Sequence, residues 1–211
     1  MHEPSNEFLP CGWEVQGRRG IALVVAGPSG AGKSSVIEEI LRRDSGLSFS
    51  VSATTRARRP DEVHGRDYYF MSSEGFQQMA DSGELLEWAE YHGRRYGTLR
   101  SEVESRLATG QDVLLNVEVK GALAIRAAEL VYPVVLVFLV PPDREELARR
   151  LRGRGTESRE ELDKRMAIAE EEITYIPSFN FLVVNERVEL AAQRIQSVLT
   201  AERCRVVRCP A

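Results

Sequence analysis

The sequence has no long apolar run, and none approaches the ~20 consecutive apolar residues that a membrane-spanning helix needs. Its first residues also lack the positive start and the apolar core of a secretory signal peptide. These absences argue against a membrane protein and against secretion. We expect residues 1–19 to form a flexible tail ahead of the first apolar segment.

Cysteine is scarce, and its three copies, Cys11, Cys204 and Cys209, lie near the two ends of the chain. No two of them have the CxxC spacing of a zinc site, and their odd number does not suggest a disulfide framework. A reducing cytoplasm is therefore the expected location.

Positive charge is not in excess either, because the formal net charge is −4. A general nucleic-acid binder needs a basic face to displace counterions, so we expect no nucleic-acid partner. Hydrophobic residues make up 43% of the chain and charged residues 28%, which is close to the average of soluble globular proteins. A length of 211 residues suits one large domain.

Apolar runs alternate with amphipathic stretches along most of the chain, which is the pattern of a parallel sheet covered by helices. The run Ile21–Ala26 has the length and β-branching of a buried strand, and Ser34–Arg43 follows it with the spacing of an amphipathic helix. Further strands are expected at Asp112–Val117, Val134–Val140 and Phe181–Val184. Further helices are expected at Glu102–Thr109, Val119–Ala128, Arg144–Arg152, Arg159–Tyr175 and Glu189–Glu202. The pattern predicts an α/β fold.

Two segments interrupt this alternation. Between Phe49 and Tyr96, short β-like pieces (FSVSATT, RDYYF and LLEWAEY) surround one short helix near Phe76–Ala80, so we expect residues 50–99 to form an inserted lobe. In the run RLRGRGTES, Arg150–Ser158, glycines and arginines separate two helices, so we expect residues 142–172 to form a mobile lid. The core would then consist of residues 20–49, 100–141 and 173–211.

The segment Gly27-Pro-Ser-Gly-Ala-Gly-Lys-Ser34 fits the phosphate-binding pattern G-x-x-x-x-G-K-[ST], between a predicted strand and a predicted helix. The glycines let backbone N–H groups point at phosphates, and the helix N-terminus adds positive dipole character. Lys33 can reach the β- and γ-phosphates, and the Ser34 hydroxyl is placed to bind Mg²⁺. The motif predicts a nucleoside triphosphate but not the acceptor, because GTPases, ATPase motors and small-molecule kinases share it.

Further motifs in the inserted lobe concern that acceptor. They are Ser50-Val-Ser-Ala-Thr-Thr-Arg56, the run Arg58–Phe70, Glu87-Trp-Ala-Glu and Tyr96-Gly-Thr98. With Gly-Arg-Gly-Thr-Glu157 and Val-Val-Asn185, they closely resemble the guanylate kinase family from about Ile21 to Asn185. The resemblance implies a P-loop kinase with a parallel core sheet, a GMP-binding lobe and a mobile lid. It also implies phosphoryl transfer from ATP to GMP, with Mg²⁺ as cofactor and no membrane partner.

The resemblance also implies which residues bind GMP. Two arginine forks and two phenol groups suit a dianionic phosphate, and the Glu87 carboxylate can accept the N1–H and N2–H₂ hydrogens of guanine. Adenine would instead present an acceptor at N1. The family's GMP contacts match Ser52, Arg56, Arg59, Tyr68, Glu87, Tyr96, Thr98 and Glu118.

The implied catalytic residues are Lys33 and three lid arginines, Arg150, Arg154 and Arg165, which would stabilise charge on the transferring phosphoryl group. Ser34 and Glu118 are the expected Mg²⁺ ligands, directly or through water. The implied ATP contacts are Gly27, Pro28, Ser29, Gly30, Ala31, Gly32, Lys33, Ser34, Ser35, Arg154 and Asn185.

One stretch departs from the family pattern. After the strand DVLL the family usually has two acidic residues spaced by one and then a glutamine–glycine pair, but this chain has Asn116-Val-Glu118-Val-Lys120-Gly121. One carboxylate remains, at Glu118, and a positive charge is added at Lys120. The magnesium and GMP contacts of this strand are therefore open to test.

Two other functions compete with this interpretation. A kinase of the same fold that acts on a phosphorylated sugar would keep the phosphate loop but have little use for Glu87, Ser52 and Thr98. A non-catalytic module that binds phosphopeptides would have no reason to keep Lys33 and Ser34. The oligomeric state is not indicated by the sequence.

Overall fold

The computed structural model describes residues 7–8, 14–15, 19–91, 93–152 and 159–205. Its centre is a five-stranded sheet in the order β11-β10-β3-β9-β4, and all of its neighbouring strands are parallel. The strands are β3 (Ala22–Ala26), β4 (Leu47–Phe49), β9 (Asp112–Asn116), β10 (Val134–Val140) and β11 (Phe181–Val184). The predicted α/β fold with a parallel core sheet is confirmed.

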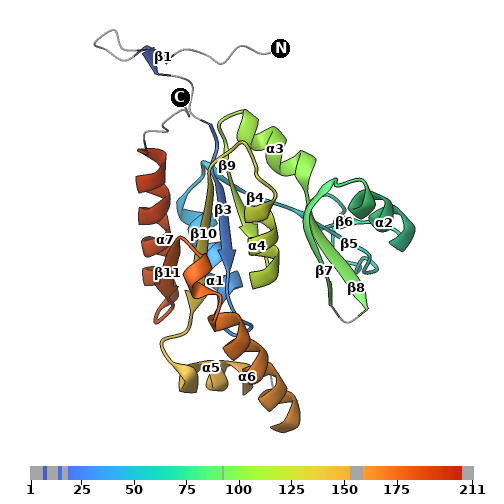
Figure 1. Ribbon diagram of the computed structural model, residues 1–211, viewed down its shortest axis with the longest axis vertical. Coiled ribbons are helices and arrows are strands. Elements are labelled where there is room, and N and C mark those ends of the chain that lie inside the picture. Colours follow the sequence, from blue (N-terminus) through green and yellow to red (C-terminus); the bar gives the residue numbers. More distant parts are fainter. Residues whose placement is uncertain (1–6, 9–13, 16–18, 92, 153–158, 206–211) are drawn as a thin grey trace.

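Helices cover both faces of this sheet because successive strand residues point to opposite sides (Figure 1). In β3, Leu23 and Val25 pack in one buried cluster with α1 (Lys33–Arg43) and α7 (Val188–Arg203). Ala22, Val24 and Ala26 of the same strand pack in a second cluster with α3 (Arg100–Ala108) and α4 (Val119–Ala127). A continuous apolar strand is thus explained by burial on both faces.

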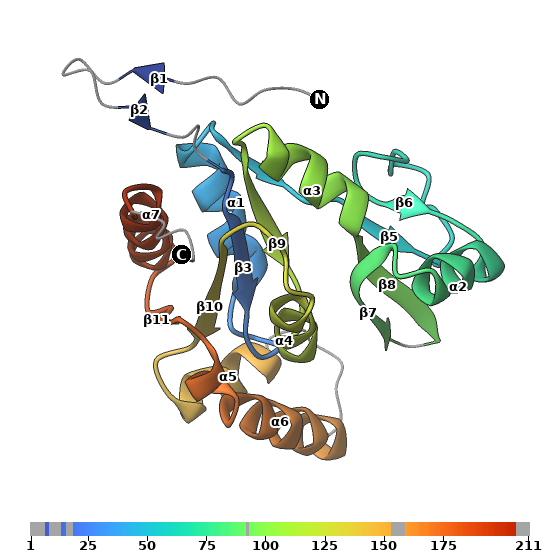
Figure 2. The same ribbon diagram turned by 45° about the horizontal axis from the view of Figure 1, so that its top comes forward.

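Residues of the predicted lobe form a separate four-stranded sheet in the order β6-β5-β8-β7, set to one side of the core (Figure 2). Its elements are β5 (Ser52–Thr54), β6 (Tyr69–Phe70), α2 (Ser73–Asp81), β7 (Leu85–Tyr91) and β8 (Arg94–Leu99). A small buried cluster of its own joins them, formed by Ala53, Phe76, Leu85 and Leu99.

The FSVSATT segment is not one piece of this lobe. Its first residue, Phe49, ends β4, which pairs with β9 in the core sheet, whereas Ser52–Thr54 pairs with β8 in the lobe. The chain therefore passes from one sheet to the other at Ser50 and Val51. The sequence reasoning also missed β8, whose charged residues and glycine hide the alternation of a strand.

Beyond the core, α5 (Arg144–Arg152) and α6 (Arg159–Ile173) pack together through Leu147, Leu151, Met166 and Ala169. A short 3₁₀ helix, Ile176–Ser178, leads from α6 into β11. Helix α6 ends at Ile173, two residues earlier than predicted. Residues 153–158, which include Arg154, lie outside the described part of the chain.

Within the predicted tail, β1 (Glu7–Phe8) pairs antiparallel with β2 (Glu14–Val15). The rest of residues 1–18 lies outside the description, as do Cys11 and Cys209. Cys204 is exposed. None of the helices in the described ranges is long and apolar enough to cross a membrane. The exact limits of lobe, lid and tail stay predictions.

Candidate active site

The predicted site residues of the core gather at one edge of the parallel sheet. The phosphate-binding loop follows β3, Glu118 follows β9 and Asn185 follows β11. These strands are parallel, so their carboxyl ends meet at the same edge, where Val25 of β3 lies opposite Asn116 of β9. Ligands of open α/β sheets bind at this edge.

Two glycines of the loop Gly27–Ser34 have backbone conformations and neighbours that exclude a side chain. Gly27 and Gly32 have φ values of 152° and 88°. A Cβ atom would lie 2.1 Å from the Leu139 carbonyl oxygen at Gly27, and 2.4 Å from Asn185 Nδ2 at Gly32. The loop is therefore packed tightly against the ends of β10 and β11.

Lys33 is the first residue of α1, and its ammonium group lies between the loop and β9. Nζ donates a 2.5 Å hydrogen bond to the Gly27 carbonyl oxygen and lies 3.9 Å from Glu118 Oε2. Ser34 and Ser35 follow on the exposed first turn of α1. The predicted lysine, hydroxyl and carboxylate are thus on neighbouring segments, as the interpretation of the loop requires.

Arg150 and Asn185 both contact the loop at Ala31. The Arg150 guanidinium donates to the carbonyl oxygens of Ala31 (3.2 Å) and Asn185 (2.9 Å), while Glu146 accepts from its Nε at 2.7 Å. The Asn185 side chain, 2% exposed, also donates to Ala31 O, at 2.8 Å. Both residues therefore hold the loop in position. Within the part of the chain that the structure describes, the buried Asn185 Oδ1 has no hydrogen-bond partner.

Arg165 approaches the loop from α6. Its guanidinium donates to the Ser29 hydroxyl at 2.8 Å, which brings the predicted lid helix into contact with the phosphate-binding loop. The remaining loop residues differ in exposure: Pro28 and Ala31 are buried, and Gly30 is half-buried.

In the lobe, Arg56 is the centre of a cluster of polar and aromatic side chains. Glu62 accepts from both of its terminal nitrogens, at 2.6 and 3.0 Å, and the guanidinium lies 5.4 Å from the centre of the Tyr68 ring. The rings of Tyr68 and Tyr96 meet edge to face at 6.0 Å. The hydrogen bonds from the Arg56 guanidinium and, after it, from the Arg59 backbone lower the pKa of Glu62 to about 2. Arg59 is exposed, and its backbone N–H donates to Glu62.

Glu87 lies on β7, the strand next to β8 in the lobe sheet. Its Oε1 accepts a 2.7 Å hydrogen bond from the Thr98 hydroxyl, and the β7–β8 register places the two residues opposite each other. Ser52 pairs with Thr98 on the other side. Burial raises the pKa of Glu87, the Thr98 hydrogen bond opposes the rise, and the negative charge of Glu118 adds to it. The three predicted base-contacting residues are therefore side by side across three strands.

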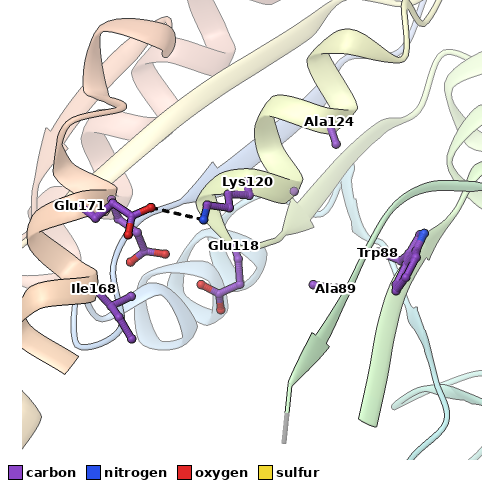
Figure 3. A pocket seen from close by; sticks show the side chains of 9 residues that line it. Trp88, Ala89, Glu118, Lys120, Ala124, Ile168 and Glu171 are labelled. Carbon is purple, nitrogen blue, oxygen red and sulfur yellow. Dashed lines mark ion pairs between the residues drawn. The ribbon is translucent and has the colours of Figure 1, made fainter. Parts of the chain in front are cut away.

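The lobe, α4 and α6 together enclose a cleft of about 240 Å³ (Figure 3). Trp88 and Ala89 of β7, Gly121 and Ala124 of α4, and Ile168 of α6 line it, with Glu118 at its core edge. Lys120 forms a 3.3 Å ion pair with Glu171, which links α4 to α6. Two residues that line the cleft thus adjoin the predicted sites: Gly121 lies next to Glu87, and Glu118 lies 3.9 Å from Lys33.

Three residues of this region were missed by sequence reasoning: Glu146, Glu172 and Gly121. Glu146 precedes Arg150 by four residues and Glu172 follows Arg165 by seven, and both spacings place the pair on one helical face. Those spacings could have been noticed. Burial, and the neighbouring Glu118 after it, raise the pKa of Glu172 to about 7. For Gly121, only the tertiary structure shows the contact.

The family model for guanylate kinase matches residues 19–202 of the chain. The chain is 43% identical to a guanylate kinase of Desulfitobacterium hafniense (strain Y51), over 93% of this chain and 97% of that protein. It is 46% identical to a guanylate kinase of Lactococcus lactis subsp. lactis (strain IL1403), with 90% and 92% covered. The structure resembles the crystal structure of guanylate kinase from Anaplasma phagocytophilum, with a TM-score of 0.70, 33% identity, and 89% and 88% of the two chains covered. On the strength of this site geometry and these matches, the chain belongs to the guanylate kinase family.

Proposed function

We propose that this protein transfers the γ-phosphoryl group of ATP to GMP, giving ADP and GDP. The single observation that carries the choice of acceptor is the carboxylate of Glu87, held by Thr98 on the lobe sheet. A carboxylate only accepts hydrogen bonds, so it matches the N1–H and N2–H₂ edge of guanine and repels the N1 acceptor of adenine. A site that loses such pairing with the wrong base can discriminate by ~10⁴-fold or more.

The phosphate of GMP would bind at the Arg56 cluster. Arg56 and Arg59 supply positive charge, and the Tyr68 and Tyr96 hydroxyls supply further donors. A dianionic phosphate on Arg56 would share this guanidinium with Glu62, which already fixes its position. Ser52 would contribute a further hydroxyl at the base.

ATP would bind at the loop Gly27–Ser35, with Lys33 at the β- and γ-phosphates. Arg165, which already reaches Ser29, would approach the transferring group from α6. Arg154 lies in the predicted lid and is proposed for the same role. Arg150 and Asn185 support the loop through Ala31 and thereby fix the direction of its phosphate-facing N–H groups. Phosphoryl transfer needs mainly such positioning and electrostatic stabilisation.

The oxygen donors at the core edge fit Mg²⁺. The exposed Ser34 hydroxyl and the Glu118 carboxylate are hard ligands on neighbouring segments, and Mg²⁺ is usually held by one or two carboxylates together with substrate phosphates. In the described ranges no group of three or more acidic, histidine or cysteine side chains could hold a metal by itself, which agrees with such a shared site. When bound, Mg²⁺ would neutralise charge on the β- and γ-phosphates.

Two observations argue against the alternatives. A sugar-phosphate kinase would have no use for a half-buried, Thr98-bonded carboxylate beside α4, and a phosphopeptide module would not need Lys33 seated inside an intact phosphate loop. The cytoplasmic location expected from the number and spacing of the cysteines stays a prediction.

The direct test mixes protein, ATP and Mg²⁺ with GMP, with AMP or with glucose 6-phosphate, and measures ADP release. We expect ADP release with GMP as the acceptor and none with AMP or glucose 6-phosphate. Lys33→Met should abolish it and retain the melting temperature of the parent, because this side chain contacts the loop and is not part of the core. Turnover on the sugar phosphate, or none on any acceptor, would overturn the proposal.

A further inference from the structure

The Glu87 carboxylate, which accepts from Thr98 through Oε1, lies close to α4 through Oε2. Gly121 is the third residue of this helix, and a Cβ atom built on it would lie 2.8 Å from Glu87 Oε2 and 3.3 Å from Glu87 Cδ. Real Cβ contacts are essentially never that short. Glu87 is thus held between a hydroxyl on Oε1 and the bare backbone of α4 near Oε2.

A methyl group at position 121 would clash with neighbouring atoms, which would have to move. The nearest atoms are the end of the Glu87 side chain, which can rotate, rather than backbone of the core. The displacement therefore costs the fold little, and it moves the carboxylate away from the place where Thr98 holds it. Hydrogen bonds to a charged group are among the stronger ones in proteins, so a misplaced Glu87 carboxylate would weaken the binding of the base.

We propose that Gly121 is a positioning residue for base recognition: its missing side chain gives the Glu87 carboxylate room to present both oxygens to guanine. The inference rests on the proposed function of Glu87. It assigns to α4, whose N-cap residue Glu118 lies beside Lys33, a second role in the lobe, because one helix then borders both the phosphate loop and the base site.

The chain offers a matched control in Gly75. It is also the third residue of a nine-residue helix, α2, and a Cβ atom there would meet only the Ser72 hydroxyl, at an ordinary 3.5 Å. Neither glycine has a positive φ. The helical backbone should therefore accept alanine equally well at both positions. Only the new methyl group of Gly121→Ala should clash with Glu87.

The experiment measures steady-state kinetics for Gly121→Ala, Gly75→Ala, Glu87→Asp and the double variant Gly121→Ala/Glu87→Asp. For Gly121→Ala we expect KM for GMP to rise about tenfold or more, with KM for ATP within about twofold. Gly75→Ala should behave as the parent. Aspartate is one methylene shorter and vacates the space, so Gly121→Ala should have little further effect in the Glu87→Asp background.

Equal effects of Gly121→Ala in both backgrounds would overturn the inference, because a general disturbance of α4 would not depend on residue 87. An unchanged KM for GMP in Gly121→Ala would overturn it as well. Should Gly121→Ala lower the melting temperature, Glu87→Asp should restore it. Glu87→Gln separates the two proposals. If this variant binds GMP as the parent does, the assignment of the guanine site to Glu87 is wrong. If KM for GMP rises in Glu87→Gln but not in Gly121→Ala, only the role of Gly121 is contradicted.

Discussion

At the scale of single residues, Arg56 and Arg59 matched the same family role but differ in the structure. Arg56 is half-buried and its guanidinium is paired with Glu62, whereas Arg59 is exposed and donates to Glu62 through its backbone N–H. The family resemblance does not indicate which of the two arginines contributes more to binding the GMP phosphate. Their surroundings favour Arg56, because a guanidinium that is already held in place loses less conformational freedom when it binds phosphate.

We predict that Arg56→Ala raises KM for GMP by one to two decades, since hydrogen bonds to charged groups are worth ~1.5–3 kcal/mol. Arg59→Ala should raise it less. Arg58→Ala is the control, because the exposed Arg58 donates to the Glu62 carbonyl and has no assigned role. Initial rates across a GMP titration provide the measurement, and unchanged GMP kinetics in both Arg56→Ala and Arg59→Ala would contradict the phosphate clamp.

Glu118 is the carboxylate retained where the family usually has two. It is 65% exposed in its side chain and 3.9 Å from Lys33. We predict that Glu118→Gln lowers kcat strongly and leaves ATP binding little changed, because the loop contacts remain. Steady-state rates across a magnesium titration test this, and turnover equal to that of the parent at every magnesium concentration would leave Glu118 without a catalytic role.

Asn116 provides the complementary experiment. It ends β9 next to the phosphate loop. If asparagine is tolerated there, Asn116→Asp should keep kcat within a few-fold of the parent, whereas a rise in kcat would show that the lost carboxylate was costly. The same magnesium titration distinguishes the two outcomes.

At the scale of elements, the link between α4 and α6 depends on a residue that departs from the family pattern. Lys120 and Glu171 form an ion pair with side chains 75% and 58% exposed. Exposed pairs contribute ~0–1 kcal/mol, so this pair holds the two helices only weakly.

We predict that Lys120→Gln changes the free energy of unfolding by less than ~1 kcal/mol. Lys164→Gln, which breaks an exposed pair with Glu160 within α6, is the matched control. Urea denaturation of both variants provides the comparison. A loss of several kcal/mol in Lys120→Gln alone would show that the α4–α6 contact is a major part of the fold.

At the scale of the whole molecule, Glu172 connects packing to pH. Its pKa is raised to about 7, mainly by burial, then by Glu118, with Lys33 and Lys120 opposing and Glu171 adding. The folded protein therefore binds a proton more tightly than the unfolded chain between the ordinary value of about 4.5 and 7. Ionising Glu172 in that window costs stability, so stability falls as pH rises through it.

We predict that Glu172→Gln flattens this decline, because glutamine has no proton to lose. Melting temperatures at pH 5 and pH 8, without nucleotide and in the presence of EDTA, should differ less in the variant than in the parent. Glu145→Gln, which removes an exposed carboxylate on α5, should leave the parental difference unchanged. A decline of the same size in Glu172→Gln would mean that other groups cause it.

The sequence by itself determined the elements with strong local signals. Strands β10 and β11 and helix α5 have the predicted bounds, because their apolar runs or spacings are bounded by proline, asparagine or glycine. The phosphate loop was evident from its glycines and Lys33. Only the tertiary structure decided which sheet each half of FSVSATT joins, that Arg150 and Asn185 support Ala31, and that Gly121 faces Glu87. Hydrophobic periodicity and turn residues act between neighbours in the chain, whereas these contacts join residues 34 to 154 positions apart, which no local pattern records.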